Sequence, residues 1–196
     1  MLRRLALSLP LLLVATAASA HPGHAPLDGH GSFMSGLLHP IFGLDHVLAM
    51  VAVGLWASLI GGRALLFVPA AFVGVMAFGF LLAVGGVGLP FVEPIILASV
   101  VVLGLVVALA LPVPVAAGTA LVGFFALFHG HAHGAEMGAA TMVAYGAGFV
   151  LSTAALHAAG IAVGLGRILE DGQGRMVTQA AGALTVAGGI LLAIPS

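Results

Sequence analysis

Two stretches of the sequence, far apart along the chain, concentrate side chains that can ligate a metal ion. The first runs from His39 to Met50 and includes Asp45 and His46. Pro40 suits the first turn of a helix, with His39 at its cap. At about 100° per residue, such a helix carries His39, His46 and Met50 on one stripe. Asp45 lies at the edge of that stripe, either as a ligand or as a carboxylate that holds an imidazole N–H.

The second stretch runs from Phe128 to Glu136. His129 and His133 stand at positions i and i+4, and Glu136 follows three residues later. A helix that continues this far presents all three side chains on one face. The stretch therefore predicts a second group of ligands, and His131, which points away from that face, is an additional candidate.

The donors in these two stretches are imidazoles, carboxylates and the thioether of Met50, and the sequence contains no cysteine. This set suits Ni²⁺, Co²⁺ or Zn²⁺ better than Cu(I), Mg²⁺ or Ca²⁺. It contains no thiolate and few anionic groups, so we expect limited affinity. A carrier needs such weakness, because it must release the ion that it binds.

The composition indicates that lipid surrounds most of this chain. Of its 196 residues, 62% are hydrophobic and only 6% are charged. A soluble domain is roughly 25% charged, so this chain lacks the charged shell that water requires. The same figures exclude a disordered chain and a nucleic-acid binder, which would need a basic patch. Ionisable side chains within membrane helices are costly, and they mark functional positions.

The N-terminus predicts a cleaved signal peptide over residues 1–20. Arg3 and Arg4 precede a short apolar run, and Ala18-Ser19-Ala20 forms an A-x-A cleavage site. The alternative is an uncleaved anchor helix. Cleavage leaves a polar, periplasmic tail over residues 21–38, which we interpret as an exposed segment that collects metal. Its candidate ligands are His21, His24 and His30.

The remaining residues, 39–196, predict an all-α, polytopic transmembrane domain. Glycine, proline and charge interrupt the apolar sequence at five places, which gives six helices of spanning length. Their approximate ranges are 40–60, 64–84, 93–111, 114–135, 138–165 and 176–194. With a periplasmic start, Arg63, Arg167 and Arg175 all fall in inside loops, as the positive-inside rule requires. We therefore expect a protein of the cytoplasmic membrane with both mature termini in the periplasm.

This topology brings the two stretches to the same side of the membrane. His46 lies roughly 9 Å from the outer end of the first helix, and His129 lies at a similar depth in the fourth helix. We therefore predict that both stretches contribute to one metal site. His157 lies roughly 28 Å along the fifth helix, too far to join it. We expect His157 to serve in helix packing instead.

The residues of both stretches resemble the HupE/UreJ family of small membrane proteins. The first stretch matches the pattern His39-Pro40-x-x-Gly43-x-Asp45-His46-x-x-x-Met50, and the Phe128–Glu136 run is similar to the second motif of that family. The resemblance implies a secondary permease for nickel or cobalt, associated with hydrogenase or urease maturation. It also implies that the functional residues are His39, Asp45, His46 and Glu136.

The expected function is import of Ni²⁺ or Co²⁺ as a transported substrate, without a prosthetic group. We do not expect an enzyme, because the sequence has neither an H-E-x-x-H motif nor a nucleotide-binding P-loop. Two alternatives stay open. One is a membrane haem protein with axial histidines from the first and fourth helices. The other is a metal-binding accessory protein of hydrogenase or urease maturation that does not transport. The sequence does not indicate an oligomeric state.

Overall fold

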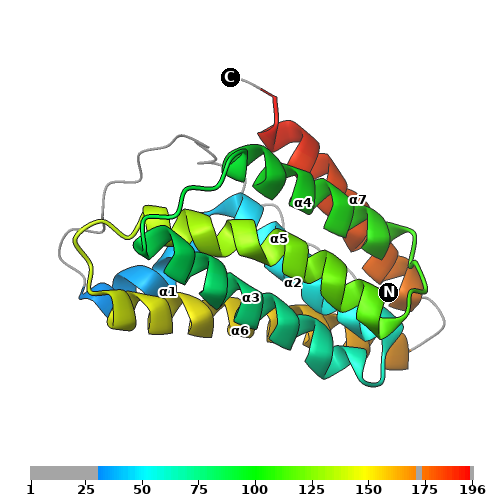
Figure 1. Ribbon diagram of the computed structural model, residues 1–196. Helices are drawn as coiled ribbons and strands as arrows, with labels where there is room; N and C mark the ends of the chain where they lie inside the picture. Colours follow the sequence, from blue (N-terminus) through cyan, green and yellow to red (C-terminus); the bar gives the residue numbers. More distant parts are fainter. Residues whose placement is uncertain (1–30, 171–173, 195–196) are drawn as a thin grey trace, which may run out of the picture.

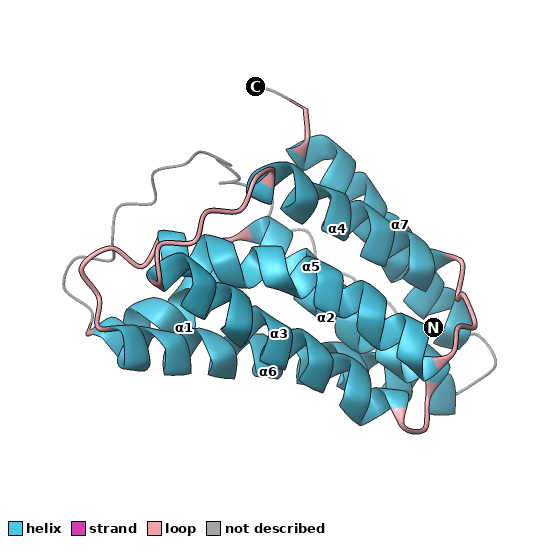
Figure 2. Cartoon of the chain, viewed as in Figure 1, coloured by secondary structure: helices cyan, strands magenta, loops and turns pink. Residues whose placement is uncertain are grey.

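The computed structural model describes residues 31–170 and 174–194, and the regular structure of this part is entirely helical (Figure 2). The predicted signal peptide and the tail ligands His21, His24 and His30 lie outside the described residues. The helices are α1 (Ser32–Phe42), α2 (Leu44–Ile60), α3 (Ala64–Val84), α4 (Val92–Ala108), α5 (Val115–Ala135), α6 (Met142–Glu170) and α7 (Gly174–Leu192).

Several helices begin or end at the glycine and proline residues where the sequence predicts a break. Gly61 and Gly62 have φ angles of 72° and 54°, which L side chains rarely adopt, and they separate α2 from α3. Pro114 stands directly before α5, where the missing N–H of a proline costs no helical hydrogen bond. These breaks place the helices from α3 onward within a few residues of their expected ranges.

The first expected span is wrong in detail, because it consists of two helices. α1 begins at Ser32, inside the stretch expected to be a polar tail, and α1 and α2 meet at Gly43 with a bend of 80°. Pro40 therefore lies near the end of α1 instead of in the first turn of a helix. Packing against α6 explains α1: a Cβ on Gly36 would meet the backbone carbonyl of Tyr145. Absence of a side chain lets the two backbones touch.

α2 is the central helix of the bundle and contacts every other described helix. All residues from Ala52 to Ser58 are buried. Around it, α3 packs along α5, α4 along α7, and α1 along the first half of α6 (Figure 1). α2 and the buried end of α5, residues 128–134, carry most of the candidate ligands, and these ligands therefore lie in the interior of the bundle.

The outer surface of the bundle is apolar, as expected for a membrane protein. Four helices, α3, α5, α6 and α7, are long and apolar enough to cross a membrane, and the bent pair α1 and α2 could form a fifth span. α4 is apolar but has only 17 residues. The outer face of α3 exposes Leu66, Phe67, Phe78 and Leu81. Such a continuous exposed apolar surface fits contact with lipid.

Candidate metal site

The two stretches singled out in the sequence meet in space. The ring centroids of His46 and His133 are 4.7 Å apart, and those of His46 and His129 are 4.9 Å apart. His39 joins them, with its ring 4.9 Å from that of His133. We call His39, His46, His129 and His133 the histidine cluster. Its rings meet edge to face, at interplanar angles of 62° to 89°.

The bend at Gly43 brings the first two histidines of the cluster together. His39 lies in the last turns of α1 and His46 in the first turn of α2, with ring centroids 6.4 Å apart. The expected single stripe of His39, His46 and Met50 on one helix is therefore wrong. A Cβ on Gly43 would lie 3.0 Å from both Asp45 Oδ1 and His46 Nδ1. Glycine at the bend thus leaves room for the Asp45–His46 pair.

Asp45 fixes the ring of His46. Its Oδ1 accepts hydrogen bonds from the backbone N–H and from Nδ1 of His46, both at 2.9 Å. A carboxylate can only accept, so Nδ1 carries a proton and Nε2 of the neutral ring carries a lone pair. His46 Nε2 is buried and has no hydrogen-bond partner among the described residues. Of the two roles expected for Asp45, this geometry fits the second, a carboxylate that holds an imidazole N–H.

Ser99 of α4 fixes the ring of His129 in a similar way. The sequence analysis did not predict this role of Ser99. The Ser99 hydroxyl donates to the carbonyl of Ile96 at 2.6 Å, so its oxygen accepts from Nε2 of His129 at 2.9 Å. This leaves Nδ1 of His129 with a lone pair, buried and unpartnered within the described structure. The only signal in the sequence is a lone hydroxyl in an otherwise apolar segment.

His133 is fully buried and stacks on Phe149 of α6, with ring centroids 4.9 Å apart and an interplanar angle of 21°. Neither of its ring nitrogens has a hydrogen-bond partner in the described part of the chain. Tyr145, which sequence reasoning also missed, lies nearby with its ring 6.0 Å from that of His39. Its buried hydroxyl is likewise unpartnered.

Glu136 lies at the exposed rim of the cluster. α5 ends at Ala135, and Glu136 is its C-cap residue, with its backbone N–H bonded to the carbonyl of Ala132. The Glu136 carboxylate reaches Nε2 of His39 at 3.0 Å. The Glu136 side chain is 57% exposed and that of His39 22%, whereas His129 and His133 are completely buried. Ionisable groups therefore extend from the surface into the bundle without a gap.

The other candidates lie outside the cluster. His131 points away, as expected, and its Nε2 donates to the carbonyl of Val87 at 2.8 Å. Met50 is fully buried one turn beyond His46 on α2. His157 of α6 makes no ring contact with the histidine cluster, but Phe72 of α3 contacts both His157 and His129.

The donor atoms do not converge on one point in this conformation. Among residues 31–170 and 174–194, no group of three or more His, Asp or Glu side chains is arranged to hold a metal ion. The rings of the cluster pack on one another instead of directing their nitrogens to a common centre. Ion binding here would require side-chain rotations, and it would recruit nitrogens that currently have no partner.

Comparison with known proteins identifies the family. The family model described as HupE / UreJ protein matches residues 9–192. Protein HupE of Rhizobium leguminosarum bv. viciae is 44% identical over 187 residues, which cover 94% of this chain and 95% of the relative. Comparison with solved structures finds no match. The match spans both stretches of candidate ligands and every described helix, and the chain therefore belongs to the HupE/UreJ family.

Proposed function

We propose that this protein is a secondary permease that imports Ni²⁺ or Co²⁺ across the cytoplasmic membrane. The observation that carries the proposal is the convergence of two remote stretches on one cluster. Four imidazoles and the carboxylate of Asp45 gather within a largely apolar bundle, and the carboxylate of Glu136 joins them at the exposed rim. Such groups are expensive in a membrane protein unless they have a function.

The chemistry of the cluster suits a divalent cation of the nickel or cobalt type. Two carboxylates can balance the charge of the ion, and imidazole nitrogens can replace part of its hydration shell. The buried atoms Nε2 of His46, Nδ1 of His129 and either nitrogen of His133, whichever carries the lone pair, are free to do this. The side chains must rotate to bind the ion, and the site has no thiolates. Both features favour weak binding, and weak binding allows the ion to be released.

The decrease in exposure from Glu136 to His129 supports entry at the Glu136 end. We propose that this end faces the periplasm, with six spans and both mature termini on that side, as the positions of the arginines require. In this arrangement α4 and the bent pair α1 and α2 each cross the membrane. The segment that precedes α1, residues 21–31, would deliver the ion to Glu136. The imported metal would supply hydrogenase or urease maturation, the association implied by the family.

Haem binding is the weaker alternative. Two axial imidazoles must stand on opposite faces of a porphyrin. The rings of His46 and His129, a histidine pair from the first expected span and the fourth, are instead in edge-to-face contact at 4.9 Å, which leaves no space for a macrocycle between them. An accessory protein that binds metal without moving it would use the same cluster, so only a transport measurement separates it from a permease.

The decisive experiment is uptake of radioactive Ni²⁺ and Co²⁺ into vesicles that contain the purified protein. We expect uptake by the wild type and at least a tenfold loss in Asp45→Ala, His46→Ala and Glu136→Ala. Thr119→Ala is the matched control, because the Thr119 hydroxyl bonds only to the carbonyl of Ala116 within its own helix. Binding without uptake by the wild type would favour the accessory protein. Normal uptake by all three site variants would contradict the proposal.

A further inference from the structure

His157 is a buried histidine that the outer cluster does not use. It lies in the middle of α6 and is only 1% exposed. Neither of its ring nitrogens has a hydrogen-bond partner within the described part of the chain. A buried imidazole without partners is unfavourable, because its polar atoms lose water and gain nothing in return. A packing role, as first expected from the sequence, does not explain this choice of side chain.

The position of His157 is one aromatic ring away from the histidine cluster. The Phe72 ring lies 5.6 Å from that of His129 and 5.0 Å from that of His157. On the other side, a Cβ on Gly54 of α2 would meet the carbonyl of His157. Gly54 lies two turns beyond His46 on α2, so His157 lies deeper in the bundle than the cluster, on the side away from Glu136.

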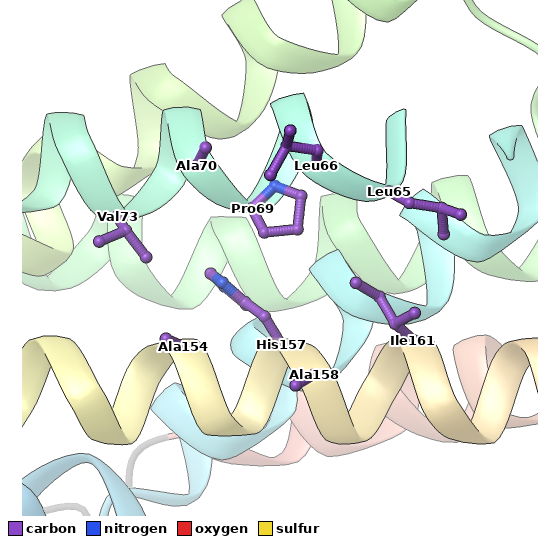
Figure 3. Close-up of a pocket in the computed structure, with 9 residues that line it drawn as sticks. All are labelled: Leu65, Leu66, Pro69, Ala70, Val73, Ala154, His157, Ala158 and Ile161. Atoms are coloured by element: carbon purple, nitrogen blue, oxygen red, sulfur yellow. The ribbon is translucent and has the colours of Figure 1, made fainter. Parts of the chain in front are cut away.

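His157 also reaches across the space between α6 and α3. It lines a groove of about 310 Å³ whose other walls are apolar side chains of these two helices. Figure 3 shows its ring extending from α6 toward Pro69 of α3. The imidazole is thus the polar feature of an apolar groove, and it is held between two helices that both border the cluster.

Two further donor atoms lie on the same pair of helices. Thr153 is one turn before His157 on α6, and its hydroxyl contacts Met76 Sδ of α3 at 3.6 Å. Both residues are completely buried. Met76 is one turn from Phe72, so both helices direct a donor to the region next to the Phe72 ring. Imidazole, thioether and hydroxyl form a neutral donor set that nickel or cobalt can use.

We propose that His157 is a second, inner binding position for the transported Ni²⁺ or Co²⁺, with Met76 and Thr153 as its neighbours. The inference rests on the proposed transport function. The ion moves from the histidine cluster past Phe72 to His157, where the unpartnered imidazole replaces a ligand lost from the cluster. No carboxylate of the described residues contacts His157, so binding there is weaker than at the outer cluster and the ion leaves readily.

The test compares His157→Leu with His157→Met. Leucine and methionine have similar volumes, and only methionine supplies a metal donor. We expect His157→Leu to lower the maximal uptake rate of Ni²⁺ at least tenfold with an unchanged KM. We expect His157→Met to stay within about threefold of the wild type. Equilibrium Ni²⁺ binding at the outer cluster should be unchanged in both variants.

Thr185→Val of α7 is the control, because it also replaces a buried polar side chain by an apolar one, and the Thr185 hydroxyl bonds within its own helix, to the carbonyl of Ala181. If His157→Leu does not fold, Met76→Leu is the second variant, with an expected threefold or greater loss of maximal rate. Wild-type uptake in the Leu variants would overturn the proposal, and so would equal losses in His157→Leu and His157→Met. Transport abolished by Asp45→Ala but unaffected by His157→Leu would leave the permease intact and remove only the inner position.

Discussion

Asp45 provides the sharpest test of the outer site, because the structure assigns it a role through His46 and not only through its charge. Its Oδ1 lies 2.9 Å from His46 Nδ1 and keeps the proton there, so that the buried Nε2 carries the lone pair. In Asp45→Ala this constraint is absent, and the ring is free to rotate or to exchange tautomers. We therefore expect weaker equilibrium binding of Ni²⁺.

The magnitude follows from the bond that is lost. A hydrogen bond to a charged group contributes about 1.5–3 kcal/mol. Since 1.4 kcal/mol corresponds to a factor of ten, we expect the Kd of Asp45→Ala to rise about 10- to 100-fold. Removal of the partner of a metal-ligating histidine typically has an effect of this size. Asp45→Asn should lose less, roughly 3- to 10-fold, because its amide oxygen still accepts the Nδ1 proton, without the charge.

The assay is isothermal titration calorimetry of the purified protein in detergent with Ni²⁺, and Thr119→Ala serves as the control. An unchanged Kd in Asp45→Ala would refute the reasoning, since the pair would then play no part in binding. Equal losses in Asp45→Asn and Asp45→Ala would show that the negative charge matters and that the orientation of the His46 ring does not.

Three other measurements address the rim, the packing and the protonation of the site. Glu136→Gln removes charge from the most exposed acid of the site, so the KM for uptake should rise severalfold with little change in maximal rate; the opposite pattern would place Glu136 in the translocation step. Gly130→Ala should destabilise the fold by about 1–3 kcal/mol in thermal unfolding, because its Cβ would meet the carbonyl of Met76. Gly74→Ala should leave the stability unchanged, because no atom lies within 4 Å of the added Cβ. Ni²⁺ affinity should fall as pH decreases from 7.5 to 5.5, because protonated imidazole does not bind metals; a pH-independent Kd would count against histidine ligation.

Much of the helical framework could be predicted because local chemistry dictates it. The φ angles of Gly61 and Gly62 and the ring of Pro114 break helices regardless of what surrounds them. α1 could not be predicted in this way. Its stability depends on contact with α6, where Gly148 meets the carbonyl of Phe33, and no short-range pattern reports such a contact.

The candidate ligands were recognisable because ionisable groups are rare in this sequence, so each histidine and acid is conspicuous. Their meeting could be predicted from the parity of the spans. The roles of Ser99 and Tyr145 could not, because a lone hydroxyl in an apolar helix has no distinctive spacing. The group with which such a hydroxyl forms a hydrogen bond depends on which helix the hydroxyl faces. His157 was interpreted as a packing residue for the same reason: only the structure shows that its nitrogens are unpartnered and that Phe72 links it to His129.

The bend at Gly43 divides the candidate ligands between the long helices α2 and α5 and the short helix α1. His46 belongs to α2, and His129 and His133 belong to α5, whereas His39 belongs to α1, which packs along α6 and meets α2 at the bend. A rotation of α1 about Gly43 would therefore move only the His39 imidazole and break its contact with Glu136. The histidines of α2 and α5 would keep their places. Binding and release of an ion would then not depend on the stability of the bundle. A covalent cross-link between α1 and α6 tests this consequence: it should slow the release of the ion without unfolding the protein.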